Sequence, residues 1–78
     1  METKQMIEEI VKELVDSPEG VQIEELKGNN TVVINIKVAK GDLGKVIGKK
    51  GRIVSALRVL FGSIFAKNNV KAIIEISD

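Results

Sequence analysis

The chain has 78 residues, the size of one small domain, and its 12 Lys and Arg against 11 Asp and Glu give a formal net charge of +1. It contains no Cys and no His, which excludes disulfides, the usual zinc sites, and Ser-His or Cys-His nucleophile pairs. The hydrophobic fraction of 44% and the charged fraction of 29% are typical of globular chains. We therefore expect a single domain over residues 1–78 that is not an enzyme and uses no metal or cofactor.

The sequence also bears on the compartment. No apolar run reaches the roughly 18 residues of a membrane span, and the segment Met1–Gln5 lacks the basic and apolar regions of a signal peptide. The absence of Cys fits a reducing environment. A starting Met and a complete set of elements favour a whole protein over a fragment of a larger one. We expect a cytoplasmic protein without a membrane partner.

The charge is divided unevenly between the two halves of the chain. Residues 1–39 hold four Lys against eight acidic residues, a net of −4, whereas residues 40–78 hold six Lys and two Arg against three acidic residues, a net of +5. Such polarity allows one surface to attract an anion. The alternative, that both halves are simply solvated helix faces, stays open on composition alone.

The first half of the chain predicts a helix followed by a hairpin. Apolar residues between Met6 and Val15 recur at helical spacing and predict a helix of about four turns, ended before Pro18. Residues 21–26 predict a strand whose alternation slips at Glu24-Glu25, which indicates a bulge or a frayed end. A turn at 28–30 connects it to the clearest strand, 31–38, as an antiparallel hairpin.

The second half predicts two helices and a last strand. Asp42 is a good N-cap for a short helix over 43–47, which the glycines of 48–51 interrupt. A long helix runs from 52 to about 67, and 70–77 is a strand rich in β-branched residues. The order α-β-β-α-α-β predicts an α+β domain with the helices packed on one face of a three-stranded sheet. The apolar stripe of the long helix comprises Ile53, Val54, Leu57, Leu60, Phe61, Ile64 and Phe65.

The segment from Gly41 to Arg52 carries the functional signal, and three familiar motifs do not fit it. No Gly-Lys-Ser or Gly-Lys-Thr closes a P-loop, and the glycine spacing misses the dinucleotide fingerprint. A membrane G-x-x-x-G is excluded because Lys45 lies between Gly44 and Gly48 with no apolar 20-mer around it.

What remains, Gly48-Lys49-Lys50-Gly51 between two helices, resembles the GXXG loop of KH domains. The longer phrase Gly44–Arg52, followed by Ala56-Leu57-Arg58, is similar to the KH signature, and the element order is that of the type II, prokaryotic-style KH fold. The resemblance spans the whole chain and points to the small stand-alone bacterial KH RNA-binding proteins (KhpA-like). It implies a protein that clamps about four nucleotides of single-stranded RNA and acts as an RNA chaperone or post-transcriptional regulator.

The physical chemistry of the segment agrees with that use. Two glycines permit a tight turn and close approach of a sugar-phosphate chain. The long helix begins at the loop, so its free N–H groups and positive dipole end face any anion there. The alternative, that these glycines only cap a helix and form a turn, would suffice for a G-x-x-G alone. The predicted RNA-binding residues are Gly44, Lys45, Val46, Ile47, Gly48, Lys49, Lys50, Gly51 and Arg52.

Base recognition is expected in the groove between the short helix and the last strand. Backbone groups around Lys71 to Glu75 are predicted to bind base edges, and the resemblance implies that aliphatic residues such as Val46, Ile47 and Ile53 form the floor under the bases. That floor compensates for the absence of aromatic stacking residues. RNA is favoured over single-stranded DNA by the resemblance only.

The back face of the long helix is a second candidate surface. Its small, uncharged residues permit close helix–helix approach and predict a homodimer. The resemblance also suggests a heterodimer with another KH-containing protein. That reading leads to a different function, a dimerisation module that regulates cell envelope or division through its partner. The alternative, that Ala and Ser only stabilise a solvated helix, stays open. The residues of the face are Ser55, Ala56, Val59, Gly62, Ser63 and Ala66.

Overall fold

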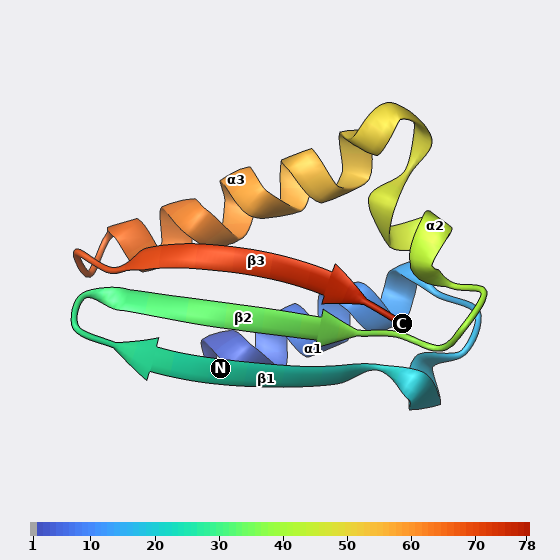
Figure 1. The fold of residues 1–78 in the computed structure, drawn as a ribbon, viewed down its shortest axis with the longest axis horizontal. Coiled ribbons are helices and arrows are strands. Elements are labelled where there is room, and N and C mark those ends of the chain that lie inside the picture. Colours follow the sequence, from blue (N-terminus) through green and yellow to red (C-terminus); the bar gives the residue numbers. More distant parts are fainter. Residues whose placement is uncertain (1) are drawn as a thin grey trace.

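The computed structural model describes residues 2–78, and its helices and strands follow the predicted α-β-β-α-α-β order (Figure 1). Single 3-10 turns at Pro18–Gly20 and Lys49–Gly51 interrupt that order. Within residues 2–78, no helix is both long enough and apolar enough to cross a membrane. The elements are α1 (Thr3–Leu14), β1 (Gln22–Gly28), β2 (Thr31–Lys37), α2 (Leu43–Ile47), α3 (Arg52–Ala66) and β3 (Lys71–Ser77).

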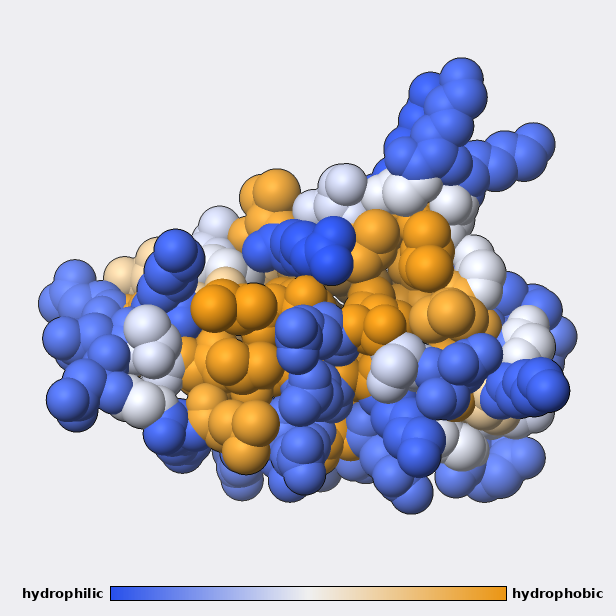
Figure 2. Space-filling view, in the orientation of Figure 1, coloured by the Kyte–Doolittle hydropathy of each residue, from blue (hydrophilic) through white to orange (hydrophobic). Residues whose placement is uncertain are grey.

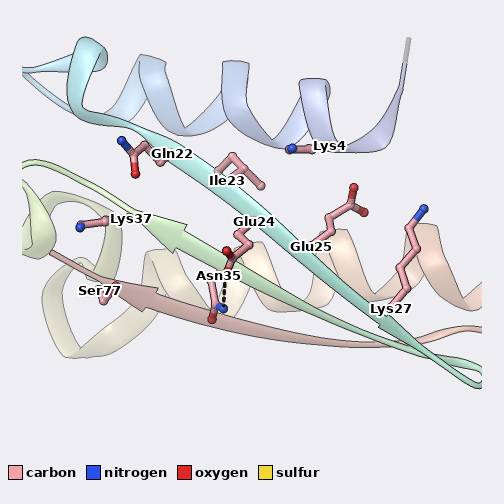
Figure 3. A pocket seen from close by; sticks show the side chains of 9 residues that line it. All are labelled: Lys4, Gln22, Ile23, Glu24, Glu25, Lys27, Asn35, Lys37 and Ser77. Atoms are coloured by element: carbon pink, nitrogen blue, oxygen red, sulfur yellow. Dashed lines mark hydrogen bonds between the residues drawn. The ribbon is translucent and has the colours of Figure 1, made fainter.

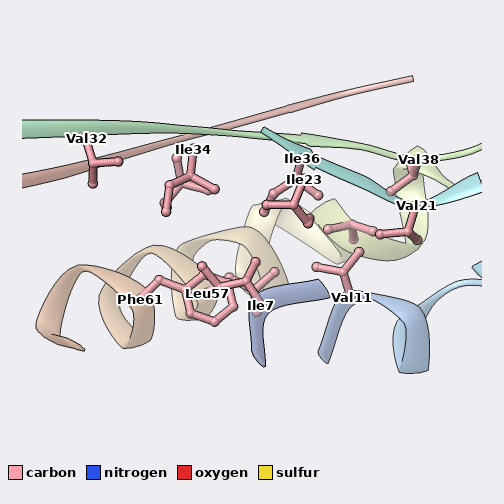
Figure 4. Close-up of a cluster of buried hydrophobic side chains, with 12 residues drawn as sticks. Ile7, Val11, Val21, Ile23, Val32, Ile34, Ile36, Val38, Leu57 and Phe61 are labelled. Carbon is pink, nitrogen blue, oxygen red and sulfur yellow. The ribbon is translucent and has the colours of Figure 1, made fainter. Parts of the chain in front are cut away.

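The three strands form one sheet in the order β1-β2-β3. β1 and β2 are the antiparallel hairpin, whereas β3 returns through α2 and α3 to lie parallel to β2. All three helices lie on the same face of the sheet, as Figure 4 shows, and the predicted α+β architecture is confirmed. β1 and β3 are the edge strands, and α3 lies beside β3 (Figure 1).

The core lies between the sheet and the helices. Alternate residues of β2 are buried and the intervening ones are more exposed, which is the period-2 pattern of a half-covered strand. Phe61 of α3 is fully buried and is the largest side chain of the core. The principal core residues, most of them labelled in Figure 4, are Ile7, Val11, Val21, Ile23, Val32, Ile34, Ile36, Val38, Val46, Leu57, Phe61 and Ile74.

The bulge predicted at Glu24-Glu25 is wrong. Glu24 pairs with Asn35 and Glu25 with Ile34, without interruption of the β1–β2 register. The alternation slips in the sequence because Leu26 points away from the helices and is 54% exposed. It belongs to the open face of the sheet, so the apolar pattern of β1 does not follow the core.

Two further expectations need correction. Leu60, assigned to the core stripe of the long helix, is 48% exposed. Asp42 does begin α2, but its side chain makes no capping hydrogen bond there. Its carboxylate instead accepts the backbone N–H groups of Asp16 and Ser17 at 3.3 and 3.0 Å. Asp42 therefore joins the end of α1 to the start of α2.

Candidate nucleic-acid interface

The loop between α2 and α3 is a compact left-handed turn. α2 ends where the Gly48 N–H donates to the Gly44 carbonyl at 2.8 Å, and the Gly51 N–H donates to the Gly48 carbonyl at 3.1 Å. Three residues have positive φ, namely Gly48 at 78°, Lys50 at 57° and Gly51 at 72°. Glycine adopts these angles without strain, so the two glycines allow the chain to reverse within four residues.

Gly48 is required by packing as well as by its backbone angle. A Cβ at this position would lie 2.6 Å from Cγ1 of Ile53, in the first turn of α3. A Cβ at Gly51 would meet nothing nearer than a methyl of Val54 at 3.9 Å. Gly48 therefore lets α3 approach the end of α2, whereas Gly51 serves the turn alone.

Three cations are exposed at this corner of the molecule. Lys49, Lys50 and Arg52 have exposed side chains and make no ion pair with any residue of 2–78. Hydrophilic side chains project from the α2–α3 corner in Figure 2. No side chain caps the start of α3, so its positive end adds to the same field.

Lys45 differs from these three cations. Its Nζ lies 3.2 Å from a carboxylate oxygen of Asp16 and 3.9 Å from one of Asp42. The Asp16 side chain is 77% exposed, so this pair is a weak surface contact. Lys45 stands beside the loop with part of its charge already compensated.

The three residues of the predicted aliphatic floor differ in how deeply they are buried. Val46 is the buried residue of α2 and packs in the hydrophobic core, so it has no surface to offer a ligand. Ile47 and Ile53 are half-buried at the loop and present the accessible part of the floor. Gly44 is exposed on α2, with open space where a side chain would stand.

The opposite wall of the predicted groove is the free edge of β3, and Arg58 reaches this edge from α3. Its Nε and Nη2 donate to the Ile74 carbonyl at 3.4 and 3.3 Å, so this carbonyl faces the groove. Backbone groups alternate sides along a strand, which turns those of Ala72 in the same direction. The neighbouring Lys71 instead donates its N–H to Asn30 across the sheet at 2.8 Å.

Arg58 is a candidate site residue that was not assigned from the sequence. It stands in the Ala56-Leu57-Arg58 phrase, seven residues after Gly51 along α3. At that distance two turns of helix carry a side chain about 10 Å from the loop and along the groove. The helical periodicity was the signal that could have placed it there.

A shallow hollow lies at the C-terminal end of α3. It has a volume of about 480 Å³ and lies between the last turns of α3 and the start of β3. The small residues Gly62, Ala66 and Ala72 line it, together with Lys71. Gly62, predicted for the back face, therefore lies on the side of that face turned toward the start of β3.

The outer face of α3 is apolar at its centre. Val59 is 70% exposed and Leu60 is 48% exposed, next to the small residues of the predicted dimer surface. The Ser63 hydroxyl donates to the Val59 carbonyl at 2.7 Å, so its polar group is turned back to the helix. The structure brings Ser55, Ala56, Val59, Ser63 and Ala66 together on this exposed surface.

Comparison with known proteins now identifies the fold. The family model described as KhpA/KhpB, KH domain, matches residues 4–76. The chain belongs to the KhpA/KhpB KH-domain family. Curated KhpA relatives include the RNA-binding protein KhpA of Chlamydia trachomatis, 47% identical over 96% of both chains. That of Clostridium acetobutylicum is 44% identical over 94% of this chain and 97% of its own, and that of Borreliella burgdorferi is 39% identical over 95% and 90%.

No solved structure matches the chain significantly. The KhpA/KhpB family match covers the first helix, the sheet and the α2–α3 loop alike. The loop, its cations and the β3 edge are therefore parts of one KH domain.

Proposed function

We propose that this protein binds single-stranded RNA, clamping about four nucleotides between the Gly48–Gly51 loop and the edge of β3. It would act in the cytoplasm as an RNA chaperone or post-transcriptional regulator, without catalysis. The observation that carries this proposal is the pair of exposed, unpaired lysines at the uncapped start of α3. Relatives of similar length named RNA-binding protein KhpA support it.

The phosphates bind at the loop in this proposal. Lys49 and Lys50 are exposed in this turn, and Gly51 follows them without a side chain. A phosphate at this point meets two full charges and the positive end of a helix of 15 residues. This recognition depends on the backbone of the nucleic acid and not on its bases.

The bases lie in the groove. Ile47 and Ile53 offer them an apolar surface, and the edge of β3 offers backbone donors and acceptors at Ala72 and Ile74. An RNA base that binds the Ile74 carbonyl must displace or share it with Arg58. The displaced guanidinium then has all its N–H groups available for a phosphate or a base.

The proposal is tested by fluorescence-anisotropy titration of a mixed-sequence single-stranded RNA across a salt series. With about four phosphate contacts at roughly 0.7 each, the slope of log K against log salt is expected near −3. The Lys49→Asp/Lys50→Asp protein should lose binding while circular dichroism shows an intact fold, because both side chains are exposed.

A control variant with the same net charge distinguishes RNA binding at the loop from general electrostatic attraction between RNA and the protein. Lys4→Asp/Lys27→Asp makes the same change in net charge beside β1, at the opposite edge of the sheet from the groove. It should bind RNA nearly as the unchanged protein does. Equal loss of binding in both variants would contradict the loop as the site, and full binding by the loop variant would place the RNA elsewhere.

A second candidate function rests on the exposed apolar centre of α3. Val59 and Leu60 are among the few large hydrophobic side chains left exposed, and such residues mark protein contacts. We propose dimerisation through this face, with a second copy or with another KH-containing protein through which the chain regulates cell envelope or division. Val59→Asp should remove the dimers that form through α3 in sedimentation, whereas a monomeric unchanged protein would contradict the homodimer.

A further inference from the structure

The face of the sheet turned away from the helices carries an apolar row that crosses all three strands. Leu26 pairs in register with Val33, and Val33 with Ile73. Leu26 is 54% exposed and Ile73 is 43% exposed, although both are large hydrophobic residues. Figure 2 shows hydrophobic side chains gathered over the hairpin end of this face, which no helix of residues 2–78 covers. Covering the row would remove apolar surface from water.

The two rows that flank the apolar row carry opposite charges. Lys71 stands on the hairpin side, whereas Glu24 and Glu75 stand on the other side. The amide of Asn35 donates to the Glu24 carboxylate at 3.4 Å within that acidic row (Figure 3). In register order, the flanking rows are Gly28–Thr31–Lys71 and Glu24–Asn35–Glu75.

We propose that this face binds a second copy of the same chain, sheet against sheet, about a two-fold axis that runs along the apolar row. With that axis, β3 of one copy lies antiparallel on β3 of the other copy. The apolar row of each copy is then covered by the apolar row of the other. It also brings the basic row of each copy onto the acidic row of the other. Lys71 of each copy then faces Glu75 of the other, and Thr31 faces Asn35.

The charges select this orientation over the other two-fold arrangement. An axis parallel to the strands would keep each row on its own equivalent and lay Glu24 on Glu75 of the second copy. Like charges directly opposite are destabilising. The face is therefore self-complementary in one orientation, which is the property that an isologous contact requires.

The size of the face predicts a weak contact. Three strands of seven residues, at about 3.3 Å per residue and about 4.8 Å between strands, cover roughly 300 Å². Stable interfaces bury about 800 Å² on each partner. The dimer is therefore reversible and depends on concentration. It uses a different surface from α3 and requires no RNA, so it stands independently of the proposed function.

The test reverses the charge at one position in each of two variants and measures their self-association, alone and mixed. Sedimentation and amide NMR chemical shifts report self-association without RNA, at up to about 1 mM protein. All proteins carry Val59→Asp, which removes the α3 contact. Lys71→Glu alone and Glu75→Lys alone should each weaken self-association about tenfold. An equimolar mixture of the two should restore it, because each mixed dimer then pairs residue 71 with residue 75 twice with opposite charges.

The matched control is a mixture of Lys71→Glu with Glu24→Lys, which has the same net charges. Glu24 faces Gly28 in the proposed orientation, so Glu24→Lys should associate with itself as the starting protein does. Its mixed dimer with Lys71→Glu keeps one like-charge contact between positions 71 and 75, so it should form more weakly than the mixed dimer of the first pair. Equal recovery in both mixtures, association unaffected by Lys71→Glu, or a fully monomeric starting protein would each overturn the proposal. Leu26→Ser should also reduce association, and its 54% exposure means that the fold should tolerate the change.

Discussion

The carboxylate of Asp42 accepts a hydrogen bond from the backbone N–H of Ser17 at 3.0 Å, across 25 positions of sequence. The same carboxylate accepts the N–H of Asp16 at 3.3 Å and is only 4% exposed. It satisfies the backbone just after α1 and fixes that segment to the start of α2. Because α2 leads directly into the glycine loop, this contact helps to position the candidate RNA site.

Replacing Asp42 is therefore expected to destabilise the whole fold. Asp42→Ala leaves two backbone N–H groups without their acceptor, and the free energy of unfolding should fall by about 1–3 kcal/mol. Asp42→Asn keeps one acceptor oxygen and should lose less. Urea denaturation monitored by circular dichroism measures both. Identical midpoints for Asp42→Ala and the unchanged protein would contradict a structural role for this carboxylate.

Gly44, within α2, and Gly48, which follows α2, are expected to respond in opposite ways to alanine. Gly48→Ala combines a φ of 78° with a Cβ 2.6 Å from the Ile53 side chain, so it should cost about 1–3 kcal/mol of stability. Gly44 has neither problem, because a Cβ there meets nothing within 4 Å. Gly44→Ala should leave stability unchanged or raise it by up to about 1 kcal/mol, as alanine favours a helix.

The RNA affinity of Gly44→Ala also tests whether the RNA backbone passes over α2. If the sugar-phosphate chain passes over α2 at Gly44, the added methyl should weaken RNA binding without loss of stability. Thermal unfolding measured on the same sample separates the two effects. A Gly48→Ala protein as stable as the unchanged chain would show that the close approach to Ile53 is easily relieved.

Local patterns predicted the elements well because the information was local. The alternation over 31–38 gave the central strand, observed as Thr31–Lys37, and the glycines at 48–51 marked the break between α2 and α3. Each signal depends on a few neighbouring residues. The spacing of apolar side chains predicts the strand, and the conformational freedom of glycine predicts the break between the helices.

The misses all concern contacts between distant segments. The slip in alternation at Glu24-Glu25 predicted a bulge or a frayed end, yet Leu26 pairs with Val33, and Val33 with Ile73, on the open face. Asp42 has the residue type of an N-cap, and nothing near it in sequence reveals the N–H groups of the α1 end. Leu60 lies at the margin of a broad stripe, and only the packing against one sheet decides that it stays exposed.

Arg58 is expected to contribute to RNA affinity from the groove. Its guanidinium is held on the Ile74 carbonyl by two bonds of 3.3 and 3.4 Å, both long for N–H···O bonds. The remaining N–H groups are free to meet a phosphate. Arg58→Ala should therefore weaken RNA binding and reduce the magnitude of the salt slope by about 0.7, the share of one phosphate in a single strand.

Arg58→Lys separates the charge of this residue from its shape. A lysine keeps the phosphate attraction, so the salt slope should stay as in the unchanged protein, but it lacks the planar fork that reaches a carbonyl and a ligand together. The base preference measured by selection from random single-stranded RNA should then change while the salt slope does not. If Arg58→Ala leaves both affinity and slope unchanged, the guanidinium serves only to tie α3 to β3, and the Ile74 carbonyl is not a place where bases bind.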